Sequence, residues 1–362
     1  MVTKIHRPLC KGDGVALVNP AGVLPERFRK QHGYVVKYLN NLGFSVKDYV
    51  IESGWENPTK RSEAFLTAFT DAQVKAVLPL CGGARIYDIL PLLDYRVIAA
   101  NPKIICGFSE LSALMITIAE RANLLTFVGP HLNFLNPKAS NQENWFTLRS
   151  FWNMLQWDWH GKNGLSKNEA YHFFVAPRTL ILPIVVRNIY REPIRIKNSS
   201  WRDNFYLSLN PDQEVSGEVL IGSLAALVRL CWIGMAPTLA GKVVFLDTLD
   251  MSFEAIKDLL QRLNSYCHLE RTAGIIFSSF GERTDRKDVM FPELRSKDHL
   301  RIFLQEVSDF LGGKQEIFYG FPLGHCAYKL TLPVGLRATF VGNEGKLLLQ
   351  ESPYLTEKNN PE

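Results

Sequence analysis

The chain has 362 residues, of which 46% are hydrophobic and 21% charged. This composition excludes a disordered or fibrous chain, and the length is enough for two domains, each with its own core. Lys and Arg total 41 against 36 Asp and Glu, a net charge of +5. The basic residues are spread along the chain rather than clustered, which argues against binding to nucleic acid.

The cysteines and the apolar stretches indicate the cellular compartment. None of the six cysteines forms a CxxC pair, so we expect reduced thiols and no zinc site. Residues 1–13 lack the apolar core of a signal peptide. The longest apolar stretch, 219–240, is interrupted by Arg229 and Pro237 and is unsuited to span a membrane. We therefore expect a cytoplasmic protein without a membrane partner.

Short apolar strands alternate with helical patterns from residue 14 to about residue 135. Strands are predicted at 14–20, 44–50, 76–80, 103–106 and 125–128, and helices at 27–42, 61–71, 87–93 and 111–122. An alternation of this kind predicts an α/β fold with a doubly wound parallel sheet.

The pattern changes in the middle of the chain and then returns to α/β near Gly217. Helices are predicted at 223–231, 252–263 and 298–311, and strands at 242–246, 273–277, 317–321, 337–340 and 346–350. We therefore predict an N-terminal α/β domain over 1–165, a connection with a substrate loop over 166–215, and a C-terminal β/α domain over 216–362.

Ser109 is the first candidate for chemistry, in the segment Gly-Phe-Ser-Glu-Leu between a predicted strand and a predicted helix. A serine at a sharp strand-to-helix turn is exposed, and the backbone N–H groups that follow it can bind an oxyanion. The alternative is that Ser109 simply caps the helix.

Two glycines, Gly82 and Gly83, end another strand and would let the backbone approach a ligand or donate to an oxyanion. A plain tight turn is the alternative. His131 follows a further strand, after Gly-Pro, and could line the same edge of the sheet.

His325 and Asp247 each follow a predicted strand of the C-terminal domain. His325 ends the loop Gly-Phe-Pro-Leu-Gly-His, whose rigidity would fix an imidazole well, and a neutral histidine commonly activates serine. An acid at a strand end can orient that histidine. The alternatives are a surface histidine and a helix-capping acid, with Asp250 and Glu254 as neighbouring acids.

Seven blocks between about residues 12 and 335 together resemble the LD-carboxypeptidase family of serine peptidases, and more specifically its microcin C immunity branch. The blocks are CGGARIYDILPLLDY, NPKIICGFSELSAL, GPH, SSWRDN, GEVLIGSLAALVRLCWIG, GKVVFLDT and GFPLGHCAYKLTLPVG. The resemblance implies a Rossmann-like N-terminal domain, a C-terminal β/α domain, a homodimer, and no metal or organic cofactor.

The family's Ser-Glu-His triad maps onto Ser109, Asp247 and His325. The implied oxyanion donors are the N–H groups of the Gly82-Gly83 turn and of Glu110. In SSWRDN, Trp201 matches a tryptophan that stacks on the nucleotide part of the substrate, and Asp203 matches an acid of the same loop. A hydrophobic anchor is the alternative role for Trp201.

Three departures from the family pattern matter. Asp247 stands where the family has glutamate, and Glu110 where it has aspartate. The glycine turn has Cys81 and Asp88 in place of two arginines, which argues against recognition of a substrate carboxylate by arginines at those two positions.

The sequence thus predicts a serine peptidase or amidase with a Ser-His-Asp triad, acting on a peptide-like amide of a microcin C-type aminoacyl- or peptidyl-nucleotide conjugate. One alternative is an LD-carboxypeptidase that acts on murein tetrapeptides. The other, motivated by the departures at Asp247 and Glu110, is a binding protein of the same fold without hydrolytic activity.

Overall fold

The chain folds into two compact units in the computed structural model. The first comprises residues 1–158, 330–335 and 353–362, and the second comprises residues 159–329 and 336–352. The structure describes residues 3, 5, 7–132, 135, 142–156, 171–176, 179–181, 207–210, 213–249, 251–278, 296–326, 328–342 and 346–355. Among these residues, no helix combines the length and apolar character needed to cross a membrane.

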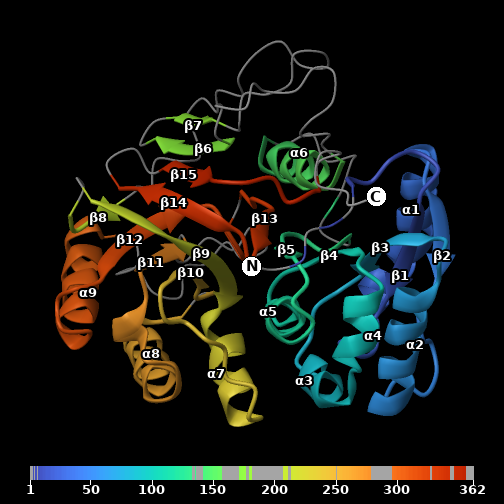
Figure 1. Cartoon of the computed structure of the whole chain (residues 1–362), viewed down its shortest axis with the longest axis horizontal. Helices are drawn as coiled ribbons and strands as arrows, with labels where there is room; N and C mark the ends of the chain where they lie inside the picture. The colour runs from blue at the N-terminus through green and yellow to red at the C-terminus, as the bar shows by residue number, and fades with distance from the viewer. Residues whose placement is uncertain are drawn as a thin grey trace. The chain divides into compact units, whose positions relative to one another are not determined.

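The first unit is built on a six-stranded sheet in the order β13-β5-β4-β3-β1-β2 (Figure 1). Its strands are β1 (Gly14–Val18), β2 (Ser45–Asp48), β3 (Val74–Pro79), β4 (Ile104–Gly107), β5 (Thr126–Val128) and β13 (Leu332–Val334). The first five are parallel, and β13 runs antiparallel to β5. Strands β1, β3 and β4 are buried almost throughout, which explains their continuous apolar sequence.

Helices cover both faces of this sheet, which confirms the doubly wound fold. They are α1 (Glu26–Asn41), α2 (Pro58–Thr70), α3 (Ile86–Ile89), α4 (Tyr95–Ala100), α5 (Leu111–Arg121) and α6 (Gln142–Gln156). Helices α2 to α5 contact one another on one face. On the other face, Trp152 of α6 donates to the Tyr38 hydroxyl of α1 at 2.7 Å and stacks on Phe44.

The second unit has a nine-stranded sheet in the order β7-β6-β15-β14-β9-β10-β11-β12-β8. Its strands are β6 (Tyr171–Ala176), β7 (Thr179–Ile181), β8 (Leu207–Ser208), β9 (Glu214–Ser223), β10 (Lys242–Asp247), β11 (Gly274–Ser278), β12 (Glu316–Phe321), β14 (Arg337–Val341) and β15 (Lys346–Leu349). Strands β9 to β12 are parallel and the others pair antiparallel.

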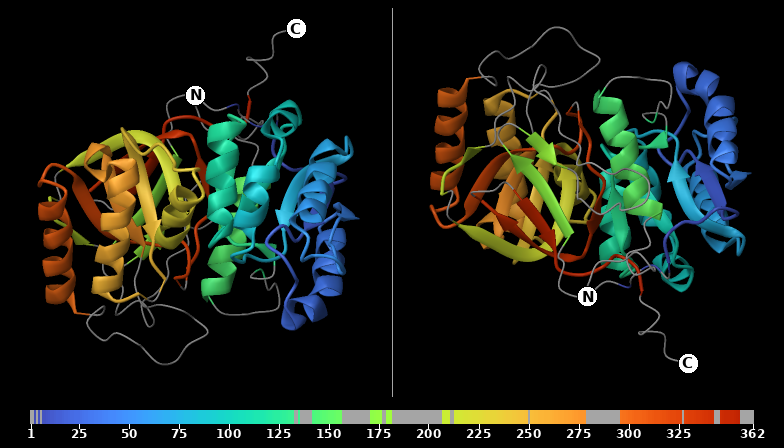
Figure 2. Two further views of the ribbon diagram at one scale, coloured as in Figure 1. Left: turned by 90° about the horizontal axis from the view of Figure 1, so that it is seen from below. Right: turned by 90° about the horizontal axis from the view of Figure 1, so that it is seen from above.

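One face of this sheet is covered by α7 (Leu224–Trp232), α8 (Phe253–Cys267) and α9 (Lys297–Phe310), which lie side by side in Figure 2. Phe253 of α8 stacks on Phe303 of α9, with 4.4 Å between the ring centroids. The predicted β/α arrangement is therefore present. The sheet also has an antiparallel extension, in which β14 and β15 were predicted as strands but their place in the sheet was not.

The path of the chain differs from the predicted division in three places. Strands β6, β7 and β8 lie within the predicted connection 166–215, yet they are strands of the second sheet. Residues 330–335 and 353–362 belong to the first unit, although the predicted C-terminal domain includes them. A three-residue strand such as β13 has too few side chains for a periodic pattern to identify it or its partner.

Thr331, the residue before β13, packs closely against α6 and against the residue that follows β5. The Thr331 N–H donates to Ser150 Oγ at 2.9 Å. Gly129, the residue after β5, leaves no space for a side chain, because a Cβ there would lie 2.3 Å from Thr331 Oγ1. The absence of a side chain at Gly129 therefore lets β13 complete the first sheet.

We expect Gly129→Ala to lower the free energy of unfolding by about 1–3 kcal/mol, since the added methyl group overlaps Thr331. Urea denaturation of the variant and of the wild type measures this difference. Gly33→Ala is the control, because Gly33 lies in the helical backbone of α1 and a Cβ there meets no atom within 4 Å. A loss at Gly129 no larger than the loss at Gly33 would show that the two segments do not pack as described.

Candidate active site

Ser109 lies in a strained turn between β4 and α5. Its φ of 61° is in the left-handed region, which non-glycine residues seldom adopt. Gly107, two residues earlier, permits the tight reversal, because a Cβ there would lie 3.0 Å from the Leu111 side chain. Ser109 is half-buried, whereas Phe108 beside it is buried. Strain at a partly exposed serine is typical of a functional site.

Ser109 does not cap α5, in contrast to the alternative interpretation of the sequence. The residue that caps α5 is Glu110, and its side chain makes no capping hydrogen bond. Ser109 instead offers its carbonyl oxygen to Ser112, whose N–H and Oγ donate to it at 2.9 and 2.7 Å. The Tyr87 hydroxyl of α3 donates to the Glu110 carboxylate, and this bond ties the turn to the neighbouring helix.

The glycine turn and His131 lie next to Ser109 within the first unit. A Cβ on Gly82 would lie 3.7 Å from Ser109 Cβ and 3.9 Å from His131 Nε2. A Cβ on Gly83 would lie 3.1 Å from the carbonyl oxygen of Ala21, in the loop after β1. His131 is buried against Phe108, with 5.0 Å between the ring centroids. The carboxyl ends of β3, β4 and β5 thus bring these predicted residues together.

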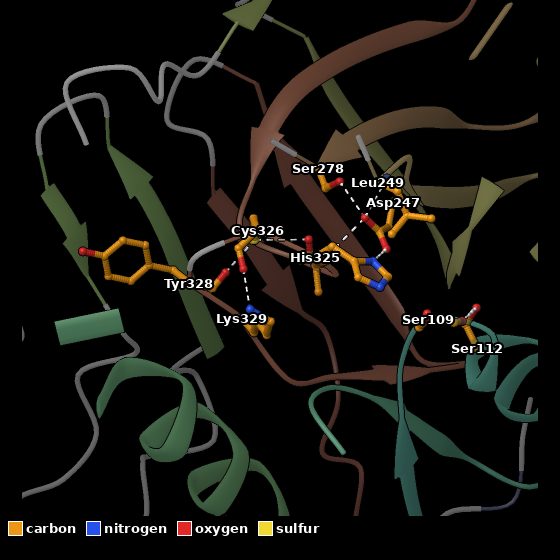
Figure 3. Close-up of polar contacts among 10 residues, drawn as sticks. Ser109, Ser112, Asp247, Leu249, Ser278, His325, Cys326, Tyr328 and Lys329 are labelled. Atoms are coloured by element: carbon orange, nitrogen blue, oxygen red, sulfur yellow. Dashed lines mark hydrogen bonds and ion pairs between the residues drawn. The ribbon is translucent and has the colours of Figure 1, made fainter. Parts of the chain in front are cut away.

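In the second unit, Asp247 and His325 are in direct contact (Figure 3). Asp247 ends β10, and His325 follows β12 after a three-residue loop. The Asp247 Oδ2 and His325 Nδ1 atoms are 2.5 Å apart, and the His325 N–H donates to Asp247 Oδ1 at 3.3 Å. Because the carboxylate is at Nδ1, proton transfer by His325 to or from a substrate would use Nε2.

Asp247 is buried, and its neighbours favour the ionised form. Burial alone raises the pKa of its carboxyl group. The charge and hydrogen bonds of His325, together with the Leu249 N–H, outweigh burial, so that the pKa lies below its ordinary value. Ser278 Oγ of β11 also donates to Oδ1 at 3.5 Å. The carboxylate therefore stays ionised at neutral pH.

The helix-cap interpretation of Asp247 does not hold either. The residue that caps α8 is Ser252, whose Oγ accepts from the Ala255 N–H at 3.2 Å. Of the alternative acids, Glu254 is exposed in the first turn of α8, and Asp250 lies outside the described residues.

Gly324 makes the contact between Asp247 and His325 possible. Its φ is +73°, and a Cβ there would lie 2.2 Å from Asp247 Cγ. Only glycine adopts this backbone conformation without cost and leaves space for the carboxylate.

Arg61 of α2 is a residue that the sequence analysis did not single out. It is 1% exposed, and its Nη1 donates to the carbonyl oxygens of Pro20 and Arg85 at 2.8 and 2.7 Å. Its Nη2 forms an ion pair with Asp88 at 2.9 Å. Arg61 thereby joins the loop after β1 to the loop after β3. Its neighbours Lys60 and Ser62 are polar, so the local sequence does not distinguish Arg61 from a surface arginine.

Two predicted substrate residues, Trp201 and Asp203, lie outside the described residues, so their roles stay predictions. Among the described residues, no cluster of three or more His, Cys, Asp or Glu side chains could hold a metal ion. The six cysteines are free thiols, and Cys231 and Cys267 lie 3.6 Å apart.

We expect Gly324→Ala to reduce stability more than Gly234→Ala. Both glycines have a φ of +73°, but a Cβ at Gly234 meets nothing within 4 Å. The backbone strain, about 1–2 kcal/mol, is therefore shared, and the overlap with Asp247 should add about 1–3 kcal/mol at Gly324 alone. Urea denaturation compares the two variants, and equal losses would contradict the close approach of Gly324 to Asp247.

Comparisons with known proteins agree with this architecture. Residues 15–129 match the LD-carboxypeptidase N-terminal domain, and residues 216–340 match the LD-carboxypeptidase C-terminal domain. The microcin C7 self-immunity protein MccF of Escherichia coli is 24% identical over 370 residues, covering 97% of each chain. A probable murein peptide carboxypeptidase of Bacillus subtilis is 23% identical over 92% of this chain and 90% of its own.

Solved structures share the fold over nearly the whole chain. MccF in complex with aspartyl sulfamoyl adenosine superposes with a TM-score of 0.75 at 21% identity, covering 98% of this chain and 100% of that one. An MccF-like protein from Bacillus anthracis gives a TM-score of 0.71 at 21% identity, over 96% and 99% of the two chains. Matches to both domain models, in the expected order along one chain, confirm the resemblance seen in the sequence. This chain belongs to the LD-carboxypeptidase family of peptidases, peptidase S66.

Proposed function

We propose that this chain is a serine peptidase or amidase in which Ser109 is the nucleophile, His325 the general base and Asp247 the residue that orients the histidine. The observation that carries the proposal is the buried carboxylate–imidazole pair, with 2.5 Å between Asp247 Oδ2 and His325 Nδ1. A carboxylate in this position fixes the tautomer and stabilises the imidazolium that forms during catalysis. The strained turn at Ser109 supports the choice of nucleophile.

The reaction proceeds in two halves. Ser109 Oγ attacks the carbonyl carbon of the amide as its proton passes to His325 Nε2, and a tetrahedral intermediate forms. The C–N bond then breaks, and His325 gives the proton to the leaving amine. A water molecule repeats the sequence on the acyl-enzyme, which releases the acid and restores the Ser109 hydroxyl.

Backbone N–H groups of Gly82, Gly83 and Glu110 would bind the oxyanion of the intermediate. The support is that Gly82 lies beside Ser109, and that Glu110 directly follows it at the start of α5, where helix polarity favours negative charge. Each donor aimed at a developing oxyanion contributes about 3–4 kcal/mol to transition-state stabilisation.

The proposed substrate is an aminoacyl- or peptidyl-nucleotide conjugate of the microcin C type. The support is the similarity to MccF, a self-immunity protein with solved complexes that contain aspartyl sulfamoyl adenosine and glutamyl sulfamoyl guanosine. Trp201 would stack on the base, which typically contributes about 1–3 kcal/mol, and Asp203 would lie in the same loop.

Hydrolysis of murein tetrapeptides at their terminal D-residue is the alternative substrate assignment. It is supported by the similarity to the probable murein peptide carboxypeptidase of Bacillus subtilis. Either substrate places a peptide-like amide at Ser109, and no metal or organic cofactor takes part in the proposed chemistry. We also propose that the chain forms a homodimer and acts in the cytoplasm.

We expect Ser109→Ala to abolish turnover while leaving the unfolding curve close to that of the wild type. A fluorophosphonate probe, followed by peptide mass spectrometry, should modify Ser109 in the wild type and leave the variant unmodified. Ser112→Ala is the matched control and should still be modified at Ser109. Wild-type turnover in the Ser109→Ala variant would show that another group is the nucleophile.

A substrate panel separates the two assignments. We expect hydrolysis of aminoacyl sulfamoyl adenosine to exceed hydrolysis of LD-linked muropeptides, and Trp201→Ala to raise KM about tenfold or more for the nucleoside substrate alone. The reverse preference would favour the murein assignment. A folded chain that hydrolyses neither substrate and does not react with the fluorophosphonate would favour the binding protein without activity.

A further inference from the structure

The loops after β1 and β3 meet where the strand order of the first sheet reverses. Strand β1 pairs with β2 on one side and with β3 on the other, so the crossovers on its two sides run in opposite directions along the sheet. In open α/β sheets, ligands bind at the carboxyl ends of the strands at this point of reversal. Here the Arg85 side chain passes Gly22, since a Cβ on Gly22 would lie 3.2 Å from Arg85 Cδ.

Arg85 belongs to a cluster of two cations and one anion. Asp88 Oδ2 lies 2.9 Å from Nη2 of Arg61 and 3.9 Å from Nη1 of Arg85. The Arg61 side chain is fully buried, whereas half of the Arg85 side chain (51%) is exposed. Because one carboxylate cannot neutralise two guanidinium groups, the cluster has a charge of +1, and Arg85 presents it to solvent.

The Arg85 guanidinium group is also held in place. It lies over the indole of Trp55, with Cζ 5.1 Å from the ring centroid. A guanidinium that stacks on an aromatic face can still bind two oxygens of a carboxylate or phosphate through its N–H edge. An arginine held before binding loses less entropy when it takes a ligand.

The position of Arg85 relates it to the proposed chemistry. It follows the glycine turn by two residues, and Gly82 of that turn is next to Ser109. A carboxypeptidase must recognise the carboxylate of the residue that it releases, and a nucleotide conjugate has an anionic phosphate or its analogue near the scissile amide. Both substrates therefore offer an oxyacid anion to a cation at this edge.

We propose that Arg85 is the residue that binds the anionic group of the substrate, with Trp55 and Asp88 as the residues that position it. The proposal rests on the proposed hydrolase function for the identity of its ligand. It assigns to Arg85 a role in binding and specificity, and no proton transfer.

Isothermal titration of four probes tests the proposal without turnover. The first pair is N-acetyl-lysyl-D-alanine and the same dipeptide with a C-terminal amide, and the second pair is adenosine monophosphate and adenosine. In each pair, only the first member has the anionic group. The full chain with Ser109→Ala is the background, so that no ligand is hydrolysed. In it, Arg85→Met should weaken binding of the anionic member of at least one pair about tenfold and leave the neutral member unchanged. The pair affected identifies the source of the anion.

Arg121→Met is the matched control. Arg121 also lies over an aromatic ring, that of Tyr95 with Cζ 5.9 Å from its centroid, but it is at the last turn of α5, away from the carboxyl ends of the strands. The Arg121→Met variant should bind all four probes as the background does. Arg85→Lys should bind the anionic probe more tightly than Arg85→Met does, because lysine keeps the positive charge but lacks the paired N–H donors of a guanidinium group.

Three results would overturn the proposal: equal losses for the charged and neutral members of both pairs, no loss in either pair, or no binding of any probe by the background protein. Failure of the proposed hydrolase function is a separate result. It would appear as a wild-type chain that neither turns over substrate nor reacts with the fluorophosphonate, whatever Arg85 binds.

Discussion

The contact between Asp247 and His325 depends on one missing side chain. Any Cβ at Gly324 would overlap the carboxylate, so the loop after β12 can approach the end of β10 only with glycine there. This approach buries the acid beside the imidazole, and the resulting bonds keep its pKa low in spite of burial. A carboxylate one methylene shorter than the family's glutamate thus reaches its histidine because the loop backbone lies directly against it.

Loops at the carboxyl ends of parallel strands organise the first unit, because the predicted site residues of that unit lie in them. Arg61 joins two of these loops by donating to the carbonyl oxygens of Pro20 and Arg85. Asp88, where the family has an arginine, is the partner of this buried cation. The aspartate at position 88 is therefore paired with Arg61 of α2. The net positive charge of the cluster is then on Arg85, which is exposed.

Strong local patterns in the sequence predicted most of the parallel strands and the positions of the candidate site residues. Buried parallel strands are continuous apolar runs, so β1, β3, β4, β10 and β11 were located within a few residues, and the doubly wound fold followed from their alternation with helices. The loop glycines and Pro322 identified the strand ends at which Ser109 and His325 were predicted, and Asp247 was predicted because it directly follows an apolar run. The local sequence also left a helix cap open for Ser109, but in the structure Glu110 has that position and Ser109 has a left-handed φ.

The sequence by itself determined the fold class, the family and the residues to consider, because hydrophobic periodicity and motif spacing are properties of neighbouring residues. Only the tertiary structure decided that β13 joins the first sheet, that β6 to β8 join the second, that Asp247 contacts His325, and that Arg61 neutralises Asp88. Each of these depends on residues far apart in the chain. Contacts of that kind are set by packing and by the burial of charge, and no local pattern encodes them.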